Sequence, residues 1–297
     1  MTRLCRILND NPTNGHAELF IKTDFISSRQ QRQPFLPASS QIMKPNFLLL
    51  TVLFLTGVLF TSCNRDDDQP TPEPGKVNMT FTNKVGSQPL QFRNTWYQNA
   101  NGDSFNVTLF NYYITNIRFN RADGSNYAEP ESYRLLDQYT RPASMAFTID
   151  SVADGTYNSI TMMIGVDSTR NTMGVQDGDL NPVLNNFWGW NTGYIFMKFE
   201  GNSPQATTTS EKLLMHTGGF SGAYNAIRTT TLPLPTPIVI AKGKTSSVAV
   251  TADIAKLFAS PNKIDFSQMQ TIHMPGPTAK MLADNYATML SVTASGN

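Results

Sequence analysis

Cysteine and histidine are both scarce in this chain. Its 297 residues include two cysteines, Cys5 and Cys63, and three histidines, His16, His216 and His273. If the chain is cleaved before Cys63, as argued below, a single cysteine remains and no internal disulfide can form. Stability must then come from the size of the core. Chemistry that needs an imidazole is confined to His216 and His273.

Charge and enzyme motifs are also sparse. Residues 63–297 hold 17 of the 23 basic and 19 of the 22 acidic side chains, without a basic patch, which excludes nucleic acid as a partner. The chain lacks H-E-x-x-H, a P-loop and G-x-G-x-x-G. The stretch G-F-S-G-A at 219–223 lacks the second glycine of a nucleophile elbow. We therefore predict that the protein is not an enzyme.

Only one long apolar run is present, at residues 47–60, and Lys44 precedes it. Its fourteen residues fall short of the roughly 20 that a spanning helix needs, and are typical of a signal-peptide core. The run ends in F-T-S-C at 60–63, which resembles a lipobox. We predict a signal peptide at 43–62 and lipidation of Cys63; the alternative is a free cysteine beside a buried core helix. Residues 1–42 are polar and aperiodic, so we interpret them as an extension from a mispredicted upstream start.

An acidic and proline-rich stretch follows Cys63. Residues 63–76 begin C-N-R-D-D-D-Q-P-T-P-E-P, a composition that favours an extended, disordered tether. The acidic cluster directly after the cysteine resembles the surface-export signal of Bacteroidetes lipoproteins. The sequence thus predicts an outer membrane lipoprotein, held to the membrane by acylated Cys63, on the cell surface or the periplasmic face.

The rest of the chain, residues 77–297, has the pattern of an all-β domain. Short segments with alternating or β-rich composition occur at 77–83, 105–119, 133–136, 157–166, 193–200, 212–216, 228–234, 237–241 and 246–251. Gly, Asp, Asn and Pro separate them. Helical patterns occur only at 253–258, with Asp253 as N-cap, and at 279–290. We predict one β-sandwich of short antiparallel strands with one or two short helices near the C-terminus.

His273 and Met274 are candidate copper ligands. They precede a P-G-P turn at 275–277, which could aim both side chains at one ion. Cu(I) prefers soft or imidazole ligands, and His216 is the second imidazole available. The alternative for each histidine is a hydrogen-bonded structural role. The eleven methionines of residues 63–297 can equally fill the core.

Trp188 and Trp190 lie two residues apart, so on a strand they would share a face. Packed in the core beside Tyr194 and Phe196, they would contribute several kcal/mol of burial.

Asp167, Asp177 and Asp179 are candidate calcium ligands, since oxygens spaced by two suit a hard cation. An EF-hand is excluded because Pro182 replaces the required glycine and Trp188 the bidentate glutamate. An irregular calcium site and a solvated turn remain as alternatives.

Several motifs together resemble the MbnP-like family, copper-binding lipoproteins and periplasmic proteins named after a methanobactin-operon member. The motifs are G-V-D-S-T-R-N-T-M-G at 165–174, W-G-W-N-T-G-Y-I at 188–195 and K-F-E-G at 198–201. F-N-Y-Y-I-T-N-I at 110–117, M-H-T-G-G at 215–219, H-M at 273–274 and A-D-N-Y at 283–286 extend the resemblance.

The resemblance implies a copper-binding β-sandwich outside the cytoplasm. It implies His216 and His273 as imidazole ligands, and oxidation of Trp188 or Trp190 to kynurenine by a di-haem peroxidase of the MauG type. The function expected is copper acquisition or buffering. The alternative is a non-enzymatic envelope binding or scaffold module that recognises a glycan or a protein and holds no metal.

Overall fold

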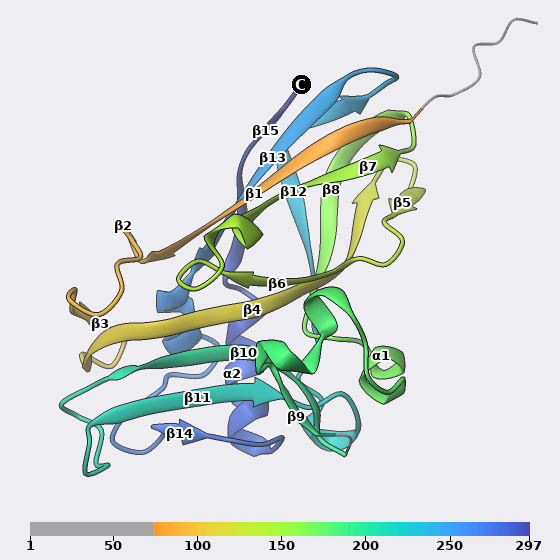
Figure 1. Ribbon diagram of the computed structural model, residues 1–297. Coiled ribbons are helices and arrows are strands. Elements are labelled where there is room, and N and C mark those ends of the chain that lie inside the picture. The colour runs from red at the N-terminus through yellow and green to blue at the C-terminus, as the bar shows by residue number, and fades with distance from the viewer. Residues whose placement is uncertain (1–73, 190) are drawn as a thin grey trace, which may run out of the picture. The chain divides into compact units, whose positions relative to one another are not determined.

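A computed structural model describes residues 74–189 and 191–297 (Figure 1). The predicted signal peptide, the predicted lipidation site Cys63, nearly all of the predicted tether and Trp190 lie outside the described residues. Within the described part, no helix is long and apolar enough to cross a membrane.

The larger of two sheets has ten strands and is centred on the long strand β4. Its strand order is β12-β8-β4-β10-β11-β14, with β3, β5 and β6 also paired to β4 and β9 paired to β10. The strands are β3 (Tyr97–Gln98), β4 (Ser104–Asn120), β5 (Asn126–Ala128), β6 (Tyr133–Asp137), β8 (Gly155–Ile164), β9 (Phe187–Gly189), β10 (Gly193–Asn202), β11 (Lys212–Gly218), β12 (Arg228–Ile240) and β14 (Thr271–Ile272).

The smaller sheet has five strands, ordered β15-β13-β1-β2 with β7 also paired to β1. They are β1 (Gly75–Val85), β2 (Gln88–Pro89), β7 (Ala146–Val152), β13 (Thr245–Asp253) and β15 (Leu290–Gly296). Its central strand β1 alternates buried and solvent-facing residues along its length, which places Val77, Met79 and Phe81 in the core.

Helices are few and short. The α-helices are α1 (Ser168–Thr172) and α2 (Pro277–Tyr286), and the 3-10 helices are η1 (Pro142–Met145), η2 (Gly178–Leu180), η3 (Pro182–Leu184), η4 (Gly222–Tyr224) and η5 (Ile254–Phe258). In Figure 1, α2 lies behind β10 and β11, and its buried residues pack against β11 and η5.

Four phenylalanines tie β4, β10 and η5 together. The ring of Phe105 lies 5.9 Å from Phe199, 5.3 Å from Phe258 and 5.7 Å from Phe266, measured between centroids in edge-to-face arrangements. Each such aromatic pair adds about 0.5–1.5 kcal/mol to the free energy of burial. This cluster stabilises the end of the large sheet at which β4 begins.

The predicted all-β sandwich is confirmed. Asp253 caps the 3-10 helix η5 by accepting a hydrogen bond from the amide of Ala255, and α2 occupies most of the second predicted helix. The predicted segments 228–234 and 237–241 form one strand, β12, with a register shift between Pro233 and Ile238. Proline has no amide hydrogen for the ladder, so a bulge is expected there.

Two features differ from the predicted pattern. β1 pairs with β13, and β11 with β14, in parallel rather than antiparallel fashion. β1 also begins at Gly75, so it includes the last two residues of the predicted tether.

Candidate metal centre

His216 and His273 come together because β11 and β14 are paired in parallel. Leu214 is paired with Thr271 and Met215 with Ile272, so the next step along both strands places His216 beside His273. Residues in register on neighbouring strands point to the same face of a sheet. The two imidazole rings lie 5.9 Å apart between centroids, at 87° to one another. Strand pairing thus gathers the only two histidines of residues 63–297.

The face that carries His216 is the one opposite the core. Leu213, Met215 and Thr217 of β11 are buried, whereas Leu214 and His216 between them are partly exposed. His273 is exposed and is the first residue after β14. Solvent therefore reaches the imidazole pair while the strands hold its position.

Glu200 fixes the orientation of the His216 ring. Nε2 of His216 lies 2.8 Å from Oε1 of Glu200, on the adjacent strand β10. This hydrogen bond is the largest cause of the lowered pKa of Glu200, and burial opposes it. In metal sites, a carboxylate that accepts a hydrogen bond from one ring nitrogen sets the tautomer and leaves the other nitrogen to bind the ion. Nδ1 of His216 is then the ring nitrogen that Glu200 leaves available to an ion.

Lys198 lies directly across the β10–β11 pairing from His216. Its side chain is 8% exposed, donates to the backbone oxygen of Asn185, and burial lowers the pKa of its ammonium group. The negative charge of Glu200 counteracts that shift. Lys198 and Glu200 thus place opposite charges two residues apart on β10, on the strand next to His216.

Trp188 extends over the same face of β11. A Cβ atom built on Gly218 would lie 2.8 Å from Cζ3 of the Trp188 indole and 2.5 Å from the carbonyl oxygen of Tyr194. Gly218 is two residues beyond His216 on β11, so the two positions share a face. Trp188 is only partly buried, whereas Tyr194 and Phe196 are buried. The structure therefore differs from the core packing of Trp188 beside these two residues that the sequence suggested. The absence of a side chain at Gly218 makes room for the indole.

The loop after His273 packs against the end of β11. A Cβ atom at Gly219, whose φ is +121°, would lie 3.1 Å from Cβ of Pro275. Met274 lies between His273 and Pro275 and is 64% exposed. Of the predicted copper ligands, the two histidines are brought together, and Met274 stays largely in solvent.

The sequence model of the MbnP family matches residues 74–275. The chain belongs to the MbnP family. A solved structure, MbnP from Methylosinus trichosporium, is similar with a TM-score of 0.46 and 15% identity over 68% of this chain and 82% of that one. No curated protein matches the chain. Of the motifs that carry the family resemblance, the MbnP match takes in all except A-D-N-Y at 283–286.

The donors around His216 suit a soft ion better than a hard one. Throughout residues 74–189 and 191–297, no group of three or more His, Cys, Asp or Glu side chains is placed to hold a metal ion. Two imidazoles with a neighbouring aromatic ring remain, and Cu(I) accepts low coordination numbers and imidazole ligands. Imidazole nitrogens suit copper, zinc and other transition metals, and the pair offers too few oxygens for calcium.

Asp167, one of the predicted calcium ligands, is engaged within the protein. Its carboxylate accepts hydrogen bonds from the hydroxyl of Tyr133 at 2.5 Å, the amide of Arg170 at 3.1 Å and the side chain of Asn116 at 3.3 Å. The Arg170 bond caps α1. Asp167 is a structural residue in this arrangement.

Asp179 is engaged as well. Its Oδ2 accepts a hydrogen bond from the Leu135 amide at 2.9 Å, and its Oδ1 pairs with the Arg141 guanidinium at 2.5 Å. Asp177 precedes η2 without capping it through its side chain. A cation next to Oδ1 occupies the place that calcium would need, so the arrangement does not support the predicted irregular calcium site.

Glu200 and Lys198 were not among the predicted site residues, although the sequence carries a signal for both. They are two apart in the strand-like segment 193–200, so they must share a face. Neither their pairing with His216 nor the reach of Trp188 is a local property of the sequence. Both depend on which strands become neighbours.

Proposed function

We propose that this MbnP-family protein binds Cu(I) as cargo, for acquisition or buffering, through the imidazoles of His216 and His273. The observation that carries the proposal is the parallel register of β11 and β14, which places the two rings 5.9 Å apart on one face. Two imidazole nitrogens are ligands that Cu(I) favours over harder cations.

Glu200 and Trp188 complete the proposed site. Glu200 holds the proton of His216 on Nε2, which leaves Nδ1 of that ring for copper. The Trp188 indole lies against Gly218 and restricts access to this face. Carboxylate–imidazole pairing of this kind raises the basicity of the ligand and so strengthens metal binding.

The proposal includes the cell-envelope setting expected from the sequence. Acylation of Cys63 would hold the domain at the outer membrane, where copper can be captured before it enters the cell. A di-haem peroxidase of the MauG type would be the partner that oxidises Trp188 or Trp190 to kynurenine. The partly exposed position of Trp188 against Gly218, two residues beyond His216 on β11, supports that part of the proposal.

Anaerobic titration of the acylated protein that starts at Cys63 with Cu(I), against a competing chelator, tests the proposal. The wild-type protein is expected to bind one equivalent, and His216→Ala, His273→Ala and the double variant are expected to lose affinity by at least about tenfold. Met173→Ala, an exposed methionine outside this site, is the control and should bind like the wild type. Equal affinity in the wild type and the double variant would refute the proposal.

The second candidate function is an envelope binding or scaffold module without metal. The observation in its favour is the His216–Glu200 hydrogen bond, which is also what a purely structural histidine would make. In that case the histidine variants lower thermal stability and leave the metal content unchanged. Intact mass and metal analysis of the native protein distinguish the two, because they report lipidation, tryptophan oxidation and bound copper together.

A further inference from the structure

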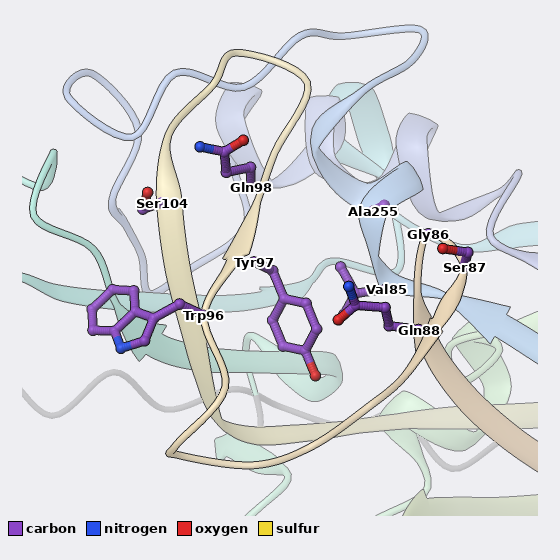
Figure 2. A pocket seen from close by; sticks show the side chains of 9 residues that line it. All are labelled: Val85, Gly86, Ser87, Gln88, Trp96, Tyr97, Gln98, Ser104 and Ala255. Carbon is purple, nitrogen blue, oxygen red and sulfur yellow. The ribbon is translucent and has the colours of Figure 1, made fainter.

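A cavity of about 530 Å³ lies between the β1–β2 hairpin and the β3–β4 hairpin (Figure 2). It belongs to a different part of the chain from the imidazole pair, and its size is within the range of small-molecule sites, about 300–1,000 Å³. None of the residues that line it is charged. A neutral ligand is therefore favoured over an ionic one.

Trp96 supplies an exposed aromatic surface at this cavity. The side chain is 50% exposed, and no other tryptophan lines the cavity. Tryptophan is enriched at binding surfaces because its indole combines a large apolar face with a polar N–H group. The negative face of an aromatic ring attracts the weakly positive C–H bonds on one side of a pyranose ring.

Polar groups complete the lining. Gln88, Gln98, Ser87 and Ser104 border the cavity with amides and hydroxyls. Gln88 and Gln98 are exposed, and within the described part of the chain neither side-chain amide is seen to bond another residue, so both can reach a ligand. A side-chain amide both donates and accepts, which matches the paired hydroxyls of a sugar.

The cavity is held open by contacts that do not involve a ligand. Gly86, at the tip of the β1–β2 hairpin, donates its amide to Oδ1 of Asp253 at 2.8 Å, and the same carboxylate oxygen caps η5. The hydroxyl of Tyr97 accepts a hydrogen bond from the amide of Gln91 at 2.8 Å. In Figure 2 the Tyr97 ring lies between the Trp96 indole and the side chain of Gln88. The walls are thus preorganised, which lowers the entropic cost of binding.

We propose that this cavity is a binding site for a neutral saccharide unit, with the Trp96 indole stacked on the sugar face and the amides of Gln88 and Gln98 bound to its hydroxyls. The proposal does not depend on copper binding. It makes the protein a glycan-recognition module in addition to its proposed role in metal binding.

An array of neutral hexose, pentose and N-acetylhexosamine oligosaccharides, with uronic-acid oligosaccharides as charged comparators, tests the proposal on the full chain. We expect the wild-type protein to capture at least one neutral class and no charged one. The captured oligosaccharide is then titrated by calorimetry. Trp96→Ala should weaken binding by about tenfold or more, Gln98→Ala by about three- to tenfold, and Trp96→Phe should retain most of the affinity.

Two controls make the result specific. Tyr224→Ala removes another exposed aromatic side chain, outside the cavity, and should bind the oligosaccharide like the wild type. The His216→Ala, His273→Ala double variant should bind it equally well, which separates this site from the copper site. Capture of no neutral oligosaccharide, or identical capture by the wild type and Trp96→Ala, would overturn the proposal. Preference for the charged comparators, or Trp96-dependent binding of a peptide in place of a saccharide, would overturn it too.

Discussion

Replacing Gly218 by alanine should displace Trp188 from the face that carries the imidazole pair. The added methyl group would lie 2.5 Å from the carbonyl oxygen of Tyr194 and 2.8 Å from Cζ3 of Trp188. Both distances are far below the roughly 3.5–4.0 Å at which nonbonded carbon contacts are most favourable. The indole can rotate away, but the carbonyl belongs to β10 and moves only with its strand.

The expected loss of stability follows from these two contacts. Inserting one methyl group into a filled space costs about 1–3 kcal/mol. Alanine in place of glycine also lowers the conformational entropy of the unfolded chain, which raises the free energy of unfolding by about 0.4–1 kcal/mol. The central values of these ranges, about 2 and about 0.7 kcal/mol, leave a net decrease in the free energy of unfolding of about 1–2 kcal/mol. For a domain of this size each kcal/mol lowers Tm by about 2–4 °C, so a decrease of about 2–8 °C is expected.

Urea denaturation followed by tryptophan fluorescence measures the effect. Gly296→Ala is the matched control, because a Cβ atom there meets nothing within 4 Å, and it should change stability by less than about 0.5 kcal/mol. The native emission spectrum of Gly218→Ala should also shift to longer wavelength as the Trp188 indole becomes more exposed. A Gly218→Ala protein with wild-type stability and an unchanged spectrum would show that Trp188 does not pack at this glycine.

Two further substitutions test the loop that leads to the site. Burial alone would raise the pKa of Asp167, but hydrogen bonds, that of the Tyr133 hydroxyl foremost, lower it below the ordinary value of about 3.9. Asp167→Asn should therefore lower the free energy of unfolding by about 1–2 kcal/mol near neutral pH. The difference in stability between wild type and variant should narrow as the pH falls through the folded-state pKa of Asp167. A difference that does not change with pH down to acid unfolding would contradict this. The side chain of Asn171 donates a hydrogen bond to the carbonyl of Val166 at 2.7 Å and accepts one from the amide of Tyr194 at 2.8 Å. Asn171→Ala should therefore lower the free energy of unfolding, measured by urea denaturation, by about 2–3 kcal/mol. A decrease below about 0.5 kcal/mol would show that these bonds do not hold the loop.

Much of the fold could be predicted because its strands are local patterns. The alternation of residues 77–83 and the turns between later segments depend only on neighbouring residues, and β1, β8, β10 and β13 lie where these patterns occur. Strand pairing is not local. β13 runs parallel to β1 because the chain crosses from the large sheet back to the small one, and no residue of either strand signals this direction.

The candidate site could be predicted only in part, because its geometry also depends on strand pairing that is not local. His216 and His273 could be singled out because histidines are scarce, and the MbnP resemblance gave them a role. Their proximity depends on β14, a strand of two residues that the composition does not reveal. The calcium prediction used the spacing of Asp167, Asp177 and Asp179 without the donors that surround them. Tyr133 and Arg141, from other strands and turns, satisfy the carboxylates of Asp167 and Asp179 in the folded chain.

The short strand β14 also determines how metal binding and stability would be linked. β14 lies at the edge of the large sheet and pairs with β11 at two positions only, so the strand pairing that positions His273 is weak. A Cu(I) ion bound by both imidazoles would join β14 to β11 across that pairing. Because the ion binds the folded arrangement and not the separated strands, it would stabilise the edge by RT ln(1 + [Cu]/Kd). Copper would then stabilise the same β11–β14 pairing that creates the site. When copper dissociates, His273 on the weakly paired β14 would become mobile, whereas His216 on β11 would stay in place.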